Sequence, residues 1–160
     1  MSVWKSPIFY FGIVLVLAVV GALIAPYVVN WNNYRDNLES WGQTLTGRQV
    51  AISGPISVRL FPWPRLVAED VSISNPKEFG DEALMHTKRI DVQLALAGLF
   101  NGDIQVEAIG LEQPKINVTR NADGIGNWVF QLGKSGLLQK VKLEKIKIND
   151  GLITVRDHAQ

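Results

Sequence analysis

Three glutamates recur within the same local pattern of apolar residues, and carboxylates in such a set are candidates for general acid–base chemistry. Glu69, Glu107 and Glu144 each lie between two apolar pairs of the form apolar-x-apolar-Glu-x-apolar-x-apolar. A converging pair of carboxylates would suit hydrolysis. Because the apolar residues before and after each glutamate differ in parity, the pattern favours a structural role. We predict that each glutamate marks a β-bulge that curves a sheet.

Other residues with chemical potential are few. His86 and His158 are not followed by a ligand-type residue three or four positions later, and the chain has no cysteine, which excludes disulfides and thiolate metal sites. No phosphate-binding glycine loop and no Gly-x-Ser-x-Gly nucleophile motif occurs. We therefore predict no catalytic residue, no metal and no cofactor, and a protein that is not an enzyme. The net charge of +1 gives no basic field for nucleic acid.

Four lysines alternate near the end of the chain, at Lys140, Lys142, Lys145 and Lys147. Lysine on alternate positions is typical of the solvated face of an edge strand, which it protects from pairing with other chains. Contact with anionic lipid headgroups is the alternative interpretation.

The segment that must position everything else is an apolar run of 18 residues, Ile8–Ala25, without charge or proline. About 20 apolar residues span the hydrocarbon core of a membrane as a helix. We predict an uncleaved transmembrane anchor over residues 1–29; a cleaved signal peptide and a buried helix are the alternatives. Lys5 precedes the run and little net charge follows it, which favours a cytoplasmic N-terminus and an exported remainder. The anchor residues are Ile8, Phe9, Ile13, Leu15, Leu17, Val20, Leu23 and Ile24.

Residues 30–48 follow a helical period. The apolar positions are Trp31, Tyr34, Leu38, Trp41 and Leu45, which lie on one face of a helix. Asn30 is a suitable N-cap and Gly47 a suitable C-terminal stop. The segment is predicted to be a short amphipathic helix that packs on the domain. A helix at the membrane surface, or one across the end of a sheet, is the alternative.

From residue 49 the period becomes two, which predicts strands. Residues 49–60 favour two short strands or one bent strand around Gly54-Pro55, and the two prolines of residues 61–65 predict an extended corner. Asn101-Gly102 is a hairpin-type turn signal. The remaining predicted strands are Leu66–Ser74, Thr87–Leu96, Ile104–Leu111, Lys115–Arg120, Trp128–Leu132, Val141–Ile148 and Leu152–Arg156. The predicted fold is mainly β.

A repeat underlies this alternation. The apolar positions from Ile104 to Val118 match those from Val141 to Val155 at a constant offset of 37, and those from Leu66 to Pro76 match the first set at an offset of 38. Constant offsets of this length are typical of arrays in which each unit stacks on its neighbour. We expect three copies of one unit, built into a curved antiparallel sheet.

Several motifs in order carry a resemblance to a known family. They are Thr46–Pro64, Val71–Asn75, Leu99–Val106, Leu111–Ile116 and Asp123–Trp128, of which Trp63 between two prolines and Asn127-Trp128 after an Asp-Gly turn are the most specific. The chain resembles the N-terminal portion of AsmA-family proteins, which are related to chorein-type, bridge-like lipid-transfer proteins. The resemblance implies a bacterial inner-membrane anchor, a periplasmic body and a curved sheet whose apolar face carries acyl chains. Family members usually run several hundred residues further, so residues 49–160 are expected to be a truncated β-groove domain.

The resemblance and the residue pattern together predict an open apolar groove. Its residues are Ile52, Ile56, Val58, Val71, Ile73, Val92, Leu94, Val106, Ile109, Leu111, Ile116, Val118, Ile146 and Ile148. A slip of one residue in strand register would turn these side chains to the other face.

The function expected from these features is phospholipid handling or transport between envelope membranes, contributing to outer-membrane biogenesis. The expected partners are membrane lipids, the inner membrane and other envelope proteins. The alternative is an anchored scaffold that assists outer-membrane protein assembly through strand pairing. An envelope hydrolase would need a catalytic cluster in sequence beyond Gln160.

Overall fold

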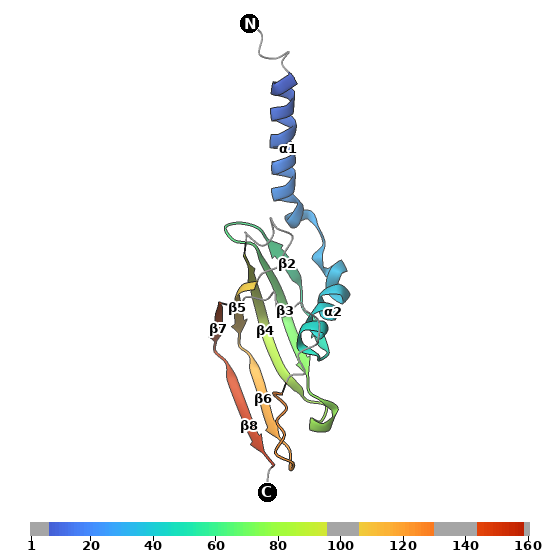
Figure 1. The fold of residues 1–160 in the computed structure, drawn as a ribbon, viewed down its shortest axis with the longest axis vertical. Helices are drawn as coiled ribbons and strands as arrows, with labels where there is room; N and C mark the ends of the chain where they lie inside the picture. The colour runs from blue at the N-terminus through green and yellow to red at the C-terminus, as the bar shows by residue number, and fades with distance from the viewer. Residues whose placement is uncertain (1–6, 96–105, 130–143, 159–160) are drawn as a thin grey trace.

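A computed structural model describes residues 7–95, 106–129 and 144–158, and Figure 1 shows a long helix standing off one end of an elongated sheet. The helical elements are α1 (Pro7–Val28), η2 (Trp31–Tyr34), α2 (Arg35–Thr46) and η3 (Lys77–Phe79). The strands are β1 (Val50–Ile52), β2 (Ile56–Arg59), β3 (Arg65–Ser74), β4 (Ala83–Leu94), β5 (Val106–Glu112), β6 (Lys115–Arg120), β7 (Lys145–Asn149) and β8 (Leu152–Asp157). The prediction of a mainly β fold with one long apolar helix and a short second helix is confirmed.

Helix α1 contains all eight residues predicted for the anchor, and none of its side chains is buried in the domain. Its 22 residues would be about 33 Å long, and it is apolar enough to cross a membrane. The helix continues through Pro26 in its last turn. The indole Nε1 of Trp31 donates a hydrogen bond of 2.8 Å to the carbonyl oxygen of Pro26, which joins the end of α1 to η2.

Residues 30–48 form two elements rather than one helix. The Asn30 side chain caps η2 by accepting from the backbone N–H of Asn32, and Gly47, at φ 69°, ends α2 in the left-handed conformation. Trp31 and Leu38 pack against the buried core, which confirms that this segment packs on the domain. Trp41 remains 55% exposed.

The eight strands form one sheet in the order β1-β3-β4-β5-β7, with β2 also paired to β3 and β6 paired to β4 and β8. The pairings among β1 to β6 are antiparallel, as predicted. The prediction is wrong for the last two strands, because β7 runs parallel to β5 and β8 runs parallel to β6. The sheet is therefore mixed.

The repeat explains the parallel pairs. Ile109 lies beside Ile146, and Val118 beside Val155, so that every paired residue is 37 positions from its partner. Equivalent positions of the second and third units thus lie side by side, and the offset of 37 is confirmed as a strand register. The sequence offset of 38 does not recur as a spacing between strands, because Leu66 pairs with Val92 and Val92 pairs with Ile109, 43 positions after Leu66. Strand β4 lies between them, and its two antiparallel pairings set that distance.

A line of left-handed residues crosses the sheet, which we call the crease. Asp70, Gln113 and Asp150 have φ values of 49°, 51° and 51°. The registers place Asp70 opposite Lys88, Lys88 opposite Gln113, and Gln113 beside Asp150. Each left-handed residue reverses the alternation along the chain. A face of the sheet that receives even-numbered side chains before that residue receives odd-numbered ones after it, or the reverse. The apolar residues before and after the crease therefore stay on one face of the sheet.

The predicted bulges have different outcomes. Glu107 is confirmed as a bulge, because Gln93 pairs with Ala108 while the next residue, Leu94, pairs with Val106. At Glu69 the prediction is wrong, since β3 keeps one register with β4 through this point. Three residues of the first strand segment, 53–55, instead lie opposite two residues of β3. Pro55 cannot donate a ladder hydrogen bond, and Gly54 allows the close approach to Glu69.

The remaining local predictions also divide. Residues 49–60 contain two strands, and the corner predicted at residues 61–65 lies at residues 60–64, because Arg65 is the first residue of β3. Strand β4 begins at Ala83, earlier than predicted. Trp128 and Val129 lie in a turn rather than a strand, where the Val129 N–H donates to the carbonyl of Gly126. The turn at Asn101-Gly102, residues 130–132, the bulge segment before Glu144, and Lys140 and Lys142 fall outside the described residues.

Candidate functional site

The fourteen residues predicted for the groove fall into rows that cross the sheet on one face. One row is Val58, Leu66, Val92, Ile109 and Ile146. The next row is Ile56, Ala68, Ile90, Leu111 and Ile148, and a third, beyond the crease, is Val50, Ile73, Met85, Ile116 and Ile153. Directly paired residues point to the same side of a sheet. Leu94 with Val106, Ile52 with Val71, and Val118 with Val155 extend the same surface, which we call the apolar face.

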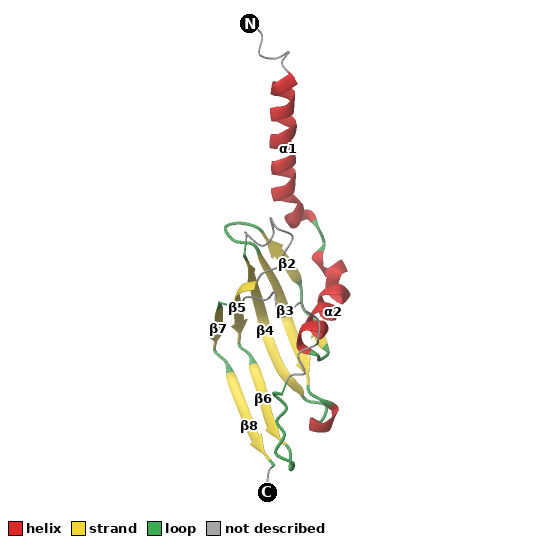
Figure 2. Ribbon diagram, viewed as in Figure 1, coloured by secondary structure: helices red, strands yellow, loops and turns green. Residues whose placement is uncertain are grey.

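Elements η2 and α2 together cover only one part of the apolar face. Trp31 and Leu38 pack on a cluster in which Ile52, Ile56 and Val71 are 5–7% exposed. These three groove candidates are therefore core residues beneath the helix in this structure. Figure 2 shows α2 near the edge of the sheet where β3 lies, with β7 and β8 at the opposite edge.

The far part of the apolar face is open. Ile146 and Ile148 on β7 are 58% and 53% exposed, and Ile153 and Val155 on β8 are 61% and 70% exposed. The candidates on β4, β5 and β6 are half-buried. One continuous set of apolar rows thus passes from a packed core to an exposed surface. Contiguous exposed apolar surface of this kind marks binding sites for apolar partners.

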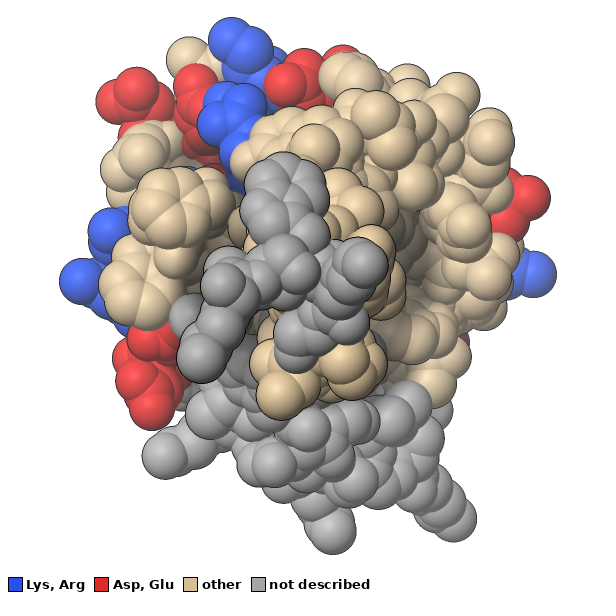
Figure 3. All heavy atoms as spheres, turned by 90° about the horizontal axis from the view of Figure 1, so that it is seen from above, with Lys and Arg blue, Asp and Glu red and all other residues tan. Residues whose placement is uncertain are grey.

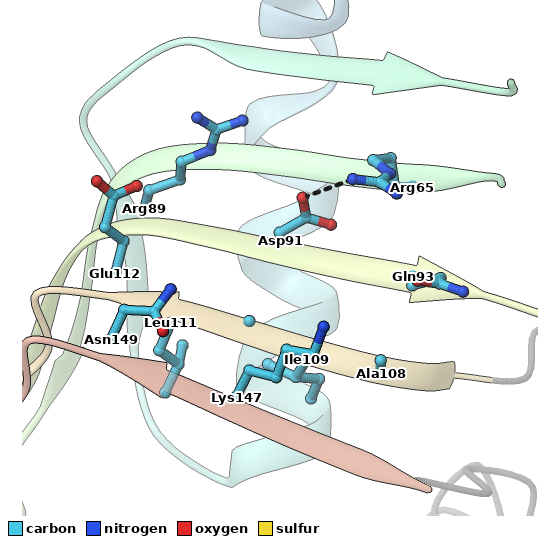
Figure 4. Close-up of a pocket in the computed structure, with 11 residues that line it drawn as sticks. Arg65, Arg89, Asp91, Gln93, Ala108, Ile109, Leu111, Glu112, Lys147 and Asn149 are labelled. Atoms are coloured by element: carbon cyan, nitrogen blue, oxygen red, sulfur yellow. Dashed lines mark hydrogen bonds and ion pairs between the residues drawn. The ribbon is translucent and has the colours of Figure 1, made fainter. Parts of the chain in front are cut away.

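The opposite face of the sheet is mostly polar, with Val67, which pairs with Asp91, as a buried apolar residue on it. Arg65, Asp91 and Lys147 occupy it, and a shallow depression of about 290 Å³ lies between them. Figure 4 shows these side chains on the side of the sheet turned away from the helices, with Arg65 and Asp91 joined by an ion pair of 3.4 Å. The lining alternates cationic and anionic groups, as in a solvated sheet surface.

Lys145 and Lys147 belong to this polar face. Both lysines are on β7, which is the last strand in the sheet order, and they lie beside Ala108 and Gly110 of β5. This place agrees with the interpretation of the alternating lysines as the solvated side of an edge strand. The face they occupy is opposite to Ile146 and Ile148, so that one strand presents two chemically different surfaces.

A buried polar cluster joins the chain after β6 to the end of α2. The Asn127 side chain is fully buried; its Nδ2 donates to Asn75 Oδ1 (2.9 Å) and to the carbonyl of Asn117 (2.7 Å), and its Oδ1 accepts from the Thr119 N–H (2.9 Å). Arg48 Nη2 donates to the carbonyl oxygens of Asn127 and Val129. Burial lowers the pKa of Arg48, an effect that Glu78 opposes.

In the sequence alone, Asn127-Trp128 is only a motif and Arg48 has no evident role. The sequence offers one signal for this cluster: Asn127 and Arg48 are strongly polar residues, and each lies at the boundary of an apolar segment. Such residues are rarely buried unless they hold backbone together.

The described residues offer little for catalysis. Across residues 7–95, 106–129 and 144–158 no three His, Cys, Asp or Glu side chains are placed to hold a metal ion. Glu69 and Glu107 lie in different strand irregularities, and the carboxylate of Glu107 accepts from Gln93 Nε2 at 3.1 Å. His86 lies in the β4 ladder opposite Ser72, and the backbone N–H of His158 donates to the carbonyl of Arg120.

Comparison with known proteins identifies relatives. The sequence model described as "AsmA family" matches residues 5–159. The chain is 27% identical over 128 residues to the AsmA family protein YhjG of Escherichia coli (strain K12). That match covers 72% of this chain and 19% of the relative, so the chain spans about a fifth of the length of the curated relative it matches. No solved structure matches the chain.

Proposed function

The chain belongs to the AsmA family, and from that premise we propose that α1 anchors it in a bacterial inner membrane while the apolar face holds phospholipid acyl chains. The family and the apolar helix together point to membrane association. In the proposed topology the N-terminus is cytoplasmic and the sheet is periplasmic, since the charge of Lys5 precedes the helix.

The continuous apolar rows are the observation that carries the proposal. They extend from the core under α2 to Ile146 and Ile148, where side chains are more than half exposed. Acyl chains would be held by burial alone, at about 25 cal/mol per Å², which needs no directional contact. Headgroups would stay in water at the edge of the sheet. Such a surface binds phospholipids with different headgroups.

Handling lipids in this way requires no bond to be broken. We propose accordingly that the chain acts by binding lipid and not by catalysis. We propose transport between the inner and outer membranes, and a contribution to outer-membrane biogenesis, for proteins as long as the relative YhjG. This chain matches 19% of that relative. The stacked register of 37 residues supports this, because further units would lengthen the same apolar face.

Photocrosslinking in cells tests the proposal on a single strand. A photoreactive residue at Ile146 or Ile148 faces the apolar side, and one at Lys145 or Lys147 on the same strand faces the polar side. We expect labelled phospholipid to crosslink at the two isoleucine positions and not at the two lysine positions. Equal lipid labelling at all four positions, or none, contradicts the proposal.

The alternative function is a scaffold for outer-membrane protein assembly. Among the described residues, β7 pairs only with β5 and β8 only with β6, so that each has an outer edge open to a further strand. Strand addition at such an edge is a common mode of peptide recognition. Protein adducts at Lys145 and Lys147, without lipid adducts at Ile146 and Ile148, would favour the scaffold.

A further inference from the structure

The corner between β2 and β3, residues 60–64, carries two exposed aromatic side chains. Phe61 is 77% and Trp63 is 52% exposed. Pro62 and Pro64 alternate with them and restrict the backbone, so the two aromatic residues are carried on a tip with few backbone conformations. Figure 1 shows this corner at the end of the sheet nearest α1, at the level of the last turn of that helix.

The corner is connected to α1 by a short series of contacts. Trp31 Nε1 bonds to the carbonyl oxygen of Pro26 in α1, and Asn32 Oδ1 accepts from the N–H of Ile56, the first residue of β2. Arg35 donates to the carbonyl oxygens of Ile52 and Gly54. Helix α1 also contacts β2 directly. The height of the corner relative to the helix end is therefore fixed by folded structure.

The chemistry of this end of the domain suits the surface of a bilayer. Trp and Phe partition to the layer of lipid headgroups, where an apolar ring is buried and the indole N–H stays near water. Arg59 is paired with Arg65 across the base of the corner, and Arg59 is exposed there, so its guanidinium can reach lipid phosphates. Figure 3, which looks down α1 onto this end, shows largely uncharged surface beside the helix and charged side chains toward the rim.

We propose that residues 60–64 form a second membrane contact, in which Phe61 and Trp63 insert into the headgroup layer of the bilayer that α1 spans. The inference rests on the membrane anchoring in the proposed function and not on acyl-chain binding. With two contacts, the anchor and the corner, the end of the sheet stays flush with the membrane. The row that begins at Val58 and Leu66 then starts at the lipid surface.

Single-cysteine labelling measures the contact directly, because the native chain has no cysteine. Full-length F61C and W63C are labelled with the fluorophore NBD and reconstituted into vesicles of phosphatidylethanolamine and phosphatidylglycerol. I125C is the matched control: Ile125 is an exposed apolar residue (54%) in the turn after β6, at the opposite end of the sheet. Quenching by nitroxide-labelled lipid and by aqueous iodide is measured for each.

We expect NBD at positions 61 and 63 to be quenched several-fold more by nitroxide lipid than NBD at position 125, and to be protected from iodide. Iodide quenching at 61 and 63 equal to that at 125 overturns the inference. So does protection from both quenchers, which would mean that protein covers the corner. Lipid crosslinking at Ile146 is measured on the same preparations, so failure of this contact is distinguishable from failure of the proposed function.

A fourth variant tests the same contact without a label. The double substitution F61S/W63S leaves α1 unchanged, and both side chains are exposed, so the domain is expected to remain folded. With the variant labelled at position 58 through V58C, we expect stronger iodide quenching than in V58C alone. No difference between the two proteins contradicts a membrane contact by the aromatic pair.

Discussion

Gln113, between β5 and β6, and Asp150, between β7 and β8, lie side by side at matching positions, and each has a φ of 51°. They are 37 residues apart, which is the offset of the sequence repeat and the register of the parallel strands. The Gln113 N–H donates to the carbonyl of Asn149, next to Asp150, at 2.9 Å. A backbone conformation that most L-amino acids disfavour is thus repeated in register, because each copy returns the apolar side chains to one face.

The backbone at Gln113 gives a prediction with opposite signs for two substitutions. Q113G is expected to raise the free energy of unfolding by about 0.5–1 kcal/mol, because glycine adopts positive φ without strain. Q113V is expected to lower it by about 1–2 kcal/mol, since a β-branched residue fits this region poorly. Urea unfolding in detergent, followed by tryptophan fluorescence, measures both. K115V, at an exposed extended position of β6, is the control and should change little. A Q113V protein as stable as wild type would contradict the crease.

Gly54 lies where the first strand segment crosses β3. A Cβ there would come within 2.7 Å of the backbone carbon and oxygen of Glu69. We expect G54A to lower the free energy of unfolding by about 1–3 kcal/mol, because backbone cannot move aside as a side chain can. G42A is the comparison, since its Cβ would meet only the side chain of Val50, at 2.9 Å. The prediction fails if G42A is the more destabilising of the two.

Asn127 holds the segment after β6 through three side-chain hydrogen bonds. N127A is expected to lower the free energy of unfolding by about 1–3 kcal/mol, because the Thr119 N–H and the Asn117 carbonyl lose their buried partner. The amide of Thr119 should also exchange faster with deuterium. N33A, at an exposed position of η2, serves as the control. Unchanged exchange at Thr119 in N127A would show that the side chain does not secure this strand.

Charge on the open part of the apolar face should affect lipid more than stability. Because Ile146 and Ile148 are exposed, I146D and I148D are expected to unfold at nearly the same urea concentration as wild type. Phospholipid recovered with the protein should fall several-fold, since a carboxylate beside an acyl chain loses its hydration. Mass spectrometry of bound lipid makes the measurement. K145S and K147S, on the other side of β7, should retain wild-type lipid; equal loss in all four variants would contradict a lipid-binding apolar face.

Much of the fold could be predicted from local pattern. The long apolar helix, the two caps at Asn30 and Gly47, the corner at residues 60–64 and the bulge at Glu107 depend on residues close together in sequence, and each is found. The place of the irregularity at Glu69 could not be predicted, because it depends on Gly54 and Pro55 in a different strand. The position of Trp128 depends on the burial of Asn127 against Asn75, 52 residues earlier.

The sequence by itself determined which residues are apolar, at what period, and that one unit recurs after 37 residues. These features follow from the two-residue and helical periods of side-chain direction, which are local. Only the tertiary structure decided that β7 and β8 run parallel to their neighbours, that β4 sets an offset of 43, and that η2 and α2 cover Ile52, Ile56 and Val71 but not Ile146. Pairing direction and coverage depend on contacts between distant segments, whose free energies no local pattern records.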